Sequence, residues 1–121
     1  MTIQDHINLK PFNTLAVPAD ARYYCHIDHP DTLQHLLRQT ETKAVPKLIL
    51  GGGSNVLFLG AYNGLILHNA IRGYQVYRET DEAIWLTLGS GEDWHEFVRY
   101  CVQHHLYGVE NLSLIPGTVG A

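Results

Sequence analysis

The sequence predicts an α+β fold in two parts. We expect a small β-α-β lobe over residues 1–68 and a second, mainly antiparallel lobe over residues 69–121 that is incomplete. In the first part, a strand pattern, a short amphipathic helix and another strand pattern follow one another, which is typical of a β-α-β unit. In the second part, short strand patterns separated by polar turns precede one helix, which is typical of antiparallel pairing.

The β-α-β unit begins with a strand pattern over Tyr23–Ile27 that leads directly into a helix start. Asp28 is a candidate capping acid, and Pro30 suits the first helical turn because its missing N–H has no partner there in any case. Leucines then recur at helical spacing, which predicts a short helix that ends near Gln39. The second strand is expected over Lys47–Leu50.

The second lobe is expected to contain short strands and one amphipathic helix. The strand patterns cover Leu65–Asn69, Tyr74–Arg78 and Ile84–Leu88. Asp93 and Glu96 have the spacing of a capping box, and an apolar stripe follows as far as about His105. We expect Trp94, Phe97 and Cys101 in this stripe to be core residues.

The strongest functional signal lies in the run Leu48–Phe58. Apolar residues lead into Gly51–Gly53, and Ser54 and Asn55 follow before the next apolar run. Glycine allows positive φ and lets backbone N–H groups approach a ligand without interference from a Cβ, and successive amides can form an anion-binding nest. The pattern favours a phosphate or pyrophosphate loop, with a tight strand-to-strand turn as the alternative.

Two familiar nucleotide loops do not match this run. A Walker loop would place Lys and Ser or Thr after the last glycine, where Ser54 and Asn55 stand. A Rossmann fingerprint would require a third glycine, where Val56 stands, and a helix opening at the loop. The sequence leaves open the possibility that the loop binds a dinucleotide in another kind of fold.

A second glycine-rich segment lies in Gly108–Ala121, where Pro116-Gly117 is followed three residues later by Gly120. Small residues at these positions permit another close approach of the backbone, at the start of what could be a helix. The two segments could hold a diphosphate from both sides. Taken alone, the second segment is better explained as a plain loop with Pro-Gly turn chemistry.

Composition limits the classes of function. The 121 residues carry eight Lys and Arg against twelve Asp and Glu, a formal net charge of −4, and no basic stripe, which argues against a nucleic-acid partner. No apolar run is long enough to span or target a membrane, so we expect a cytoplasmic location. Cys25 and Cys101 are expected to be free thiols. We expect no metal site, and His104 and His105 are interpreted as surface residues at a helix end.

The ordered set of motifs resembles the UDP-N-acetylenolpyruvoylglucosamine reductases, also called UDP-N-acetylmuramate dehydrogenases. It comprises Phe12-Asn13-Thr14, the loop Gly51–Asn55, Trp94-His95 after Gly-Glu-Asp, and Gly108–Ala121. The resemblance covers essentially the whole chain. It implies the N-terminal part of an FAD-binding domain of the vanillyl-alcohol-oxidase type.

The resemblance also implies a site and a chemistry. The implied cofactor-binding residues are Leu50, Gly51, Gly52, Gly53, Ser54, Asn55, Val56, Ile115, Pro116, Gly117 and Gly120. In such enzymes NADPH reduces a flavin, which passes hydride to the enolpyruvyl group of a UDP-sugar in peptidoglycan precursor synthesis. The cofactor supplies the hydride chemistry, and the protein supplies position and electrostatics.

The family's catalytic serine, arginine and glutamate have no counterpart here, because they belong to a part of the family that follows the position of Ala121. The 121 residues alone are therefore expected to be inactive and to bind FAD weakly. Non-covalent binding is expected, since neither His68 nor Cys101 stands in a tethering motif. The alternatives are another FAD oxidoreductase of the same superfamily and a non-catalytic nucleotide-binding module; the oligomeric state is not predicted.

Overall fold

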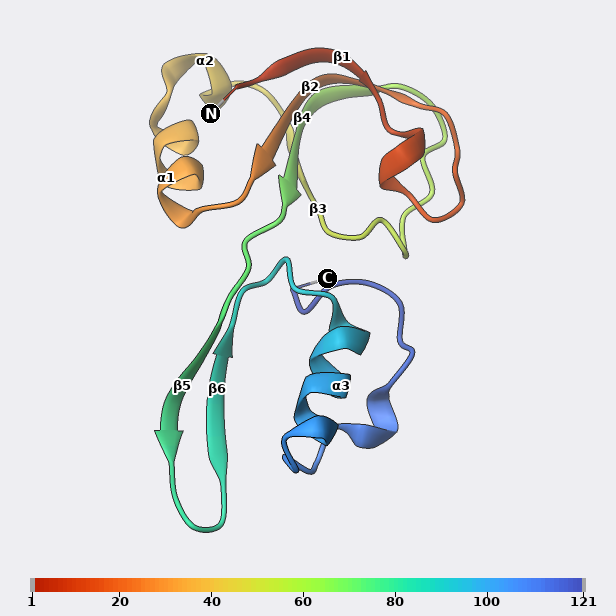
Figure 1. Cartoon of the computed structure of the whole chain (residues 1–121). Helices are drawn as coiled ribbons and strands as arrows, with labels where there is room; N and C mark the ends of the chain where they lie inside the picture. The colour runs from red at the N-terminus through yellow and green to blue at the C-terminus, as the bar shows by residue number, and fades with distance from the viewer. Residues whose placement is uncertain (1, 121) are drawn as a thin grey trace.

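The computed structural model describes residues 2–120 and has two halves joined at a narrow junction (Figure 1). In chain order the elements are β1 (Gln4–Asn8), the 3-10 helix η1 (Lys10–Phe12), β2 (Asp20–Ile27), α1 (Pro30–Arg38), α2 (Thr40–Lys43), β3 (Lys47–Leu50), β4 (Tyr62–Asn69), β5 (Tyr74–Glu79), β6 (Ile84–Leu88), α3 (Trp94–Gln103) and the 3-10 helix η2 (Glu110–Leu112). β1 to β4 form one sheet, and β5 and β6 form a separate hairpin. The α+β class is confirmed.

The larger sheet has the strand order β1-β2-β4-β3, with β1 antiparallel to β2 and the other neighbours parallel. The two strands of the predicted β-α-β unit, β2 and β3, are therefore not neighbours, because β4 lies between them. The register aligns Ile27 with Asn69 and Leu50 with His68. The carboxyl ends of β2, β3 and β4 consequently meet at one edge of the sheet, which faces the second half (Figure 1).

The central strand β4 is buried on both faces, which explains its unbroken apolar run. Ile66 packs on one side with Tyr24 and Leu50, and Leu65 and Leu67 pack on the other. Helix α1 covers the second side through the buried Leu36, and the loops around Leu9 and Phe58 cover the first. Two small cores on opposite faces thus hold the sheet edge in place.

Helix α1 begins one residue later than the capping prediction required. The N-cap is His29, whose Nδ1 accepts a hydrogen bond from the N–H of Asp31 at 3.2 Å, and Asp28 lies outside the helix. Pro30 occupies the first turn as expected. The helix ends at Arg38, where the chain turns into the short helix α2.

The second half consists of the β5–β6 hairpin and α3, joined by aromatic packing. The ring of Tyr74 on β5 lies 5.9 Å from that of Phe97 and 4.9 Å from that of Tyr100. Half of the predicted capping box is confirmed, because Asp93 Oδ1 accepts a hydrogen bond from the N–H of Glu96 at 2.9 Å, whereas the Glu96 carboxylate accepts from Arg99 at 3.0 Å. The helix ends at Gln103, two residues before the expected His105.

The junction is built from three chain segments that lie side by side, residues 69–73, 89–93 and 117–120. The N–H of Gly91 donates to the Ile71 carbonyl at 2.7 Å, and the N–H of Gly120 donates to the Ser90 carbonyl at 2.9 Å. The C-terminal segment closes the junction through an isolated β-bridge between Asp93 and Thr118, followed by a turn at residues 119 and 120.

Candidate functional site

The glycine loop follows β3 at the carboxyl edge of the sheet, as the sequence predicted. Of its three glycines only Gly53 has a left-handed backbone, with φ +65°. Its carbonyl accepts a hydrogen bond from the N–H of Thr14 at 3.0 Å, and a Cβ at Gly53 would lie 2.7 Å from the Cα of Asn13. The sequence analysis explained these glycines by the close approach of a ligand. At Gly53 a glycine is also required because the residue packs against the Phe12–Asn13 turn.

The turn that receives Gly53 is itself fixed by a buried amide. Asn13 Nδ2 donates to the carbonyls of Leu9 and Val17 at 2.8 and 3.0 Å, and its Oδ1 accepts from the N–H of Val17 at 3.0 Å. Three hydrogen bonds on a side chain that is 7% exposed make a rigid support. This contact explains physically why Phe12-Asn13-Thr14 and the distant glycine loop occur together.

The loop presents backbone donors that the protein does not use. Within residues 2–120, the backbone N–H groups of Gly52, Gly53, Ser54 and Asn55 donate no hydrogen bond to another residue. Unpaired amides on consecutive residues beside a left-handed glycine suit an anion such as a phosphate. The arrangement offers donors without a formal positive charge.

The C-terminal glycine segment meets this loop directly. Ser54 Oγ donates to the Pro116 carbonyl at 3.3 Å, and a Cβ built on Gly52 would lie 3.4 Å from the Cα of Gly117. Gly117 has φ +114°, in the left-handed region where glycine is favoured. The structure thus brings together two segments that lie more than 60 positions apart in the sequence.

A first cleft of about 540 Å³ opens between the two segments. It is lined by Ile49, Leu50, Gly51, Gly53, Ser54, Asn55, Val56, Asn69, Ile115, Pro116 and Gly120. Gly52 and Gly117, the other two predicted site residues, do not line this cleft but lie next to each other beside it. Sequence reasoning missed Ile49 and Asn69, and none of the lining side chains is charged.

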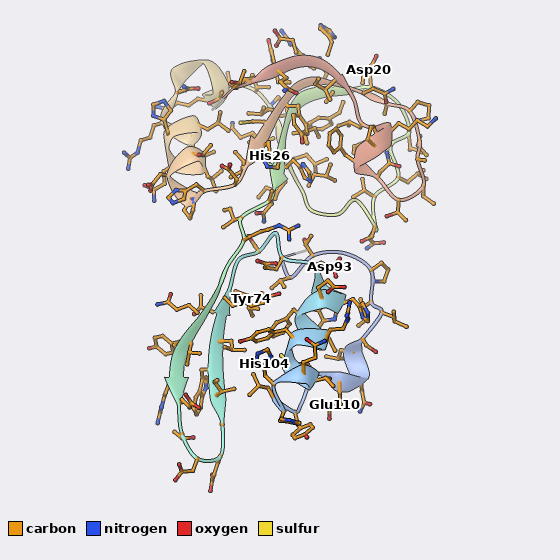
Figure 2. All side chains as sticks on the ribbon, viewed as in Figure 1. Asp20, His26, Tyr74, Asp93, His104 and Glu110 are labelled. Carbon is orange, nitrogen blue, oxygen red and sulfur yellow. The ribbon has the colours of Figure 1, made fainter. Side chains whose placement is uncertain are left out.

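A second cleft of about 590 Å³ shares Gly51 and Asn69 with the first. Its lining residues are His26, Asp28, Gly51, Gly52, His68, Asn69, Ala70, Arg72, Gly91 and Thr118. Figure 2 shows His26 near the carboxyl end of β2 and Asp93 at the start of α3, on opposite sides of the junction. Apart from the glycine loop, these residues carry no local sequence signal, because they meet only through strand register and the junction.

Two groups in the second cleft bear on what it can bind. Thr118 Oγ1 is buried and has no hydrogen-bond partner among the described residues. Since buried polar groups are normally hydrogen-bonded, this hydroxyl is available to a bound ligand. His68 Nδ1 lies 2.6 Å from the Tyr24 hydroxyl. Burial, followed by the nearby His26, lowers the pKa of His68 below its ordinary value, which favours the neutral ring.

Taken together, the clefts fit a dinucleotide diphosphate. They offer unpaired loop amides at Gly52–Asn55, an unpartnered hydroxyl at Thr118 and a close backbone approach of Gly52 to Gly117. No group of three or more His, Cys, Asp or Glu side chains that could hold a metal ion occurs in the described part of the chain. No helix within residues 2–120 combines the length and the apolar character needed to cross a membrane.

Fold and clefts define an FAD-binding domain. The profile of the family described as "FAD binding domain" matches residues 21–121, and the chain belongs to that family. FAD is therefore the cofactor that this class of domain binds. The relatives described next are reductases of one name.

The chain is 42% identical over 121 residues to a UDP-N-acetylenolpyruvoylglucosamine reductase from Amoebophilus asiaticus, covering 100% of the chain and 36% of the relative. It is 46% identical over 113 residues to the protein of the same name from Paraburkholderia phymatum, covering 93% of the chain and 33% of the relative. The chain thus spans about a third of the length of these relatives.

The crystal structure of UDP-N-acetylenolpyruvylglucosamine reductase from Thermus caldophilus has the same fold. The TM-score is 0.70 at 23% sequence identity, and the match covers 99% of this chain and 40% of that one. These comparisons confirm the resemblance that the sequence motifs indicated, which is to the N-terminal FAD-binding part of this reductase family.

Proposed function

We propose that the chain is the FAD-binding portion of a UDP-N-acetylenolpyruvoylglucosamine reductase. The whole protein would use NADPH to convert UDP-N-acetyl-enolpyruvylglucosamine to UDP-N-acetylmuramate in the cytoplasm, for peptidoglycan precursor synthesis. The observation that carries the proposal is the pair of glycine-rich segments that face each other across one cleft. Identity above 40% over essentially the whole chain to reductases of this name supports it.

We assign the FAD site to the residues that the sequence analysis named. The pyrophosphate is held by the unpaired amides of Gly52–Asn55, with Leu50, Gly51 and Val56 flanking them, and the Ser54 hydroxyl ties the loop to the Pro116 carbonyl. Ile115, Pro116, Gly117 and Gly120 form the opposite wall. Neutral donors in a partly enclosed site suit a diphosphate because a hydrogen bond from an N–H group to a charged oxygen is stronger than one to a neutral oxygen.

When bound, FAD supplies the hydride-transfer chemistry. The residues of this chain bind and orient the nucleotide: the loop amides fix the diphosphate, and the C-terminal segment limits where the remainder can lie. We propose no catalytic proton donor among residues 1–121. Glu92 is occupied at the junction, where its Oε1 accepts from the N–H of Gly73 at 2.7 Å, and Asp93 caps α3.

We propose that FAD attachment is non-covalent. Cys101 is buried within α3, and burial raises the pKa of its thiol, so little nucleophilic thiolate is present. His68 is hydrogen-bonded to Tyr24 through Nδ1. We also propose that the chain divides into lobes at residues 68 and 69, since the larger sheet ends at Asn69 and the junction begins there.

The test is a titration of the purified chain with FAD, followed by flavin absorbance and fluorescence, on three proteins. Gly52→Ala places a methyl group between the glycine loop and Gly117, where the distance of 3.4 Å to the Cα of Gly117 is tolerated sterically. Gly60→Ala is the matched control, because a Cβ there meets nothing within 4 Å. We expect saturable binding by the wild type and the control, and binding about tenfold weaker in Gly52→Ala, which corresponds to about 1.4 kcal/mol.

Absence of FAD binding by a folded wild-type chain would contradict the assignment of the site. Equal affinity of Gly52→Ala and the wild type would place the cofactor elsewhere. Binding of a simple nucleoside diphosphate in preference to FAD would instead support a non-catalytic nucleotide-binding module. Whether the whole protein reduces the UDP-sugar or another substrate of the superfamily is tested by NADPH oxidation with each substrate.

A further inference from the structure

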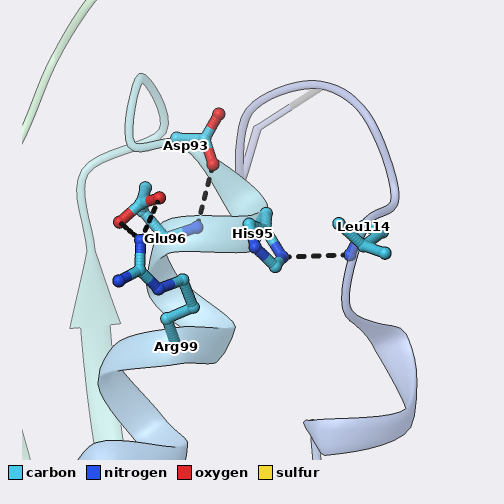
Figure 3. Close-up of polar contacts among 5 residues, drawn as sticks. All are labelled: Asp93, His95, Glu96, Arg99 and Leu114. Atoms are coloured by element: carbon cyan, nitrogen blue, oxygen red, sulfur yellow. Dashed lines mark hydrogen bonds and ion pairs between the residues drawn. The ribbon is translucent and has the colours of Figure 1, made fainter.

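The first turn of α3 holds the C-terminal segment through two neighbouring side chains. Trp94 Nε1 donates to the Leu112 carbonyl at 2.7 Å, and His95 Nδ1 accepts from the N–H of Leu114 at 3.1 Å (Figure 3). The backbone N–H of Trp94 also donates to the Gly117 carbonyl at 3.1 Å. Two consecutive residues of α3 thus support the stretch from residue 112 to residue 117.

Leu114 has a backbone conformation that its own side chain does not explain. Its φ is +62°, in the left-handed region, which costs a non-glycine residue about 1–2 kcal/mol. The side chain is 77% exposed, so its burial contributes little to holding that conformation. The hydrogen bond from its N–H to His95 is a contact that can offset the cost.

The conformation of Leu114 affects the two residues that follow it. Ile115 and Pro116 follow Leu114 directly and line the first cleft, and the Pro116 carbonyl accepts the hydrogen bond from Ser54. The direction in which the chain leaves Leu114 therefore sets the position of the cleft wall. A change of φ at Leu114 to the ordinary negative range would turn Ile115 and Pro116 away from the glycine loop.

His95 is anchored well enough to act as a support. It stands in the first turn of α3, which is fixed by the Asp93 cap and by the ion pair between Glu96 and Arg99 at 3.0 Å (Figure 3). Accepting at Nδ1 requires that this nitrogen carry no proton, so the ring is present as the Nε2–H tautomer. An asparagine side-chain oxygen can accept the same hydrogen bond, whereas an alanine cannot.

We propose that His95, together with Trp94, is a positioning residue for the flavin nucleotide: it holds Leu114 in the left-handed conformation that keeps Ile115 and Pro116 against the cofactor cleft. This inference rests on the proposed FAD function. It gives a physical role to the Trp94-His95 pair. The sequence analysis treated the pair as a family motif and Trp94 as a core residue.

The test compares the wild type with His95→Ala and His95→Asn, with His104→Ala as the matched control. His104 is the C-cap residue of the same helix, and its Nδ1 lies 2.8 Å from the Tyr100 carbonyl at the far end, away from the clefts. The first readout is hydrogen exchange at the Leu114 amide, measured by NMR without any ligand. The second is the dissociation constant for FAD, and thermal unfolding checks that each variant is folded.

We expect His95→Ala to increase exchange at the Leu114 amide by about tenfold and to weaken FAD binding by a similar factor, as loss of one supporting hydrogen bond predicts. His95→Asn should restore most of both, and His104→Ala should alter neither. Wild-type exchange or wild-type FAD affinity in a folded His95→Ala would overturn the inference. Absence of FAD binding by the wild type would instead contradict the proposed function, and the exchange at Leu114 would still decide whether His95 holds the segment.

Discussion

Gly53 packs directly against the backbone of Phe12: a Cβ built on the glycine would overlap the Phe12 carbonyl oxygen and lie 2.7 Å from the Cα of Asn13. The hydrogen bond from the Thr14 N–H to the Gly53 carbonyl, at 3.0 Å, locks the same contact. The loop beside the cleft therefore takes its shape from a turn near the N-terminus. This contact has a consequence for stability that is separate from ligand binding.

We predict that Gly53→Ala destabilises the chain even without a ligand. The substitution places a Cβ at positive φ and against backbone atoms that cannot move independently, so the free energy of unfolding should fall by about 2 kcal/mol or more. Urea denaturation measures the change, and Gly60→Ala is the control in the same loop. A stability equal to that of the wild type would show that the Phe12–Asn13 turn yields freely.

The side chains of Asn69 and Ser90 tie the junction together. Asn69 Nδ2 donates a hydrogen bond to Ser90 Oγ at 2.7 Å, and Ser90 Oγ donates one to Asn69 Oδ1 at 3.0 Å. We predict a coupling energy of about 1 kcal/mol in a double-mutant cycle with Asn69→Ala and Ser90→Ala, measured by denaturation. Strictly additive effects would mean that the pair does not hold the junction.

The stability of the chain should depend on pH through His68. Burial, and then His26, lower the pKa of His68 from its ordinary 6.5. The unfolded chain therefore binds this proton more readily than the folded chain, and the contribution of His68 is fully present above pH 6.5 and is lost as the pH falls below it.

Unfolding free energies of the wild type and His68→Asn, measured from about pH 8 to about pH 5, test this dependence. The wild type should lose more stability on acidification than the variant does. His35→Asn, on the exposed face of α1, is the control and should follow the wild type. Parallel curves for the wild type and His68→Asn would show that His68 titrates as it does in the unfolded chain.

The two thiols should be protected in the folded chain. Cys25 is 0% exposed and Cys101 is 3% exposed, and burial raises the pKa of both thiols. We predict that a thiol-specific disulfide reagent at mildly alkaline pH modifies neither cysteine until the chain unfolds, and modifies both rapidly in denaturant. Rapid reaction of one thiol under native conditions would identify a part of the chain that opens locally.

Several features were predictable because their causes are local. Lys47–Leu50 and Ile84–Leu88 form strands with the predicted bounds, since their apolar patterns and flanking turns lie within a few residues. The Asp93 cap follows from chemistry that acts over three residues. The sequence-based expectation failed at Asp28, where His29 takes the cap, and β1 was not predicted because it has no strong pattern of its own.

The amino-acid sequence alone determined the class of fold, the glycine loop after a buried strand and the resemblance to the reductase family, because each of these is recorded in contiguous residues. The tertiary structure decided which distant residues share a cleft. It inserted β4 between β2 and β3, brought Thr118 to the cleft edge, and set Gly53 against Phe12 and Leu114 against His95. The reason is that strand register and the closure of the junction depend on contacts between segments tens of residues apart, and no local pattern encodes them.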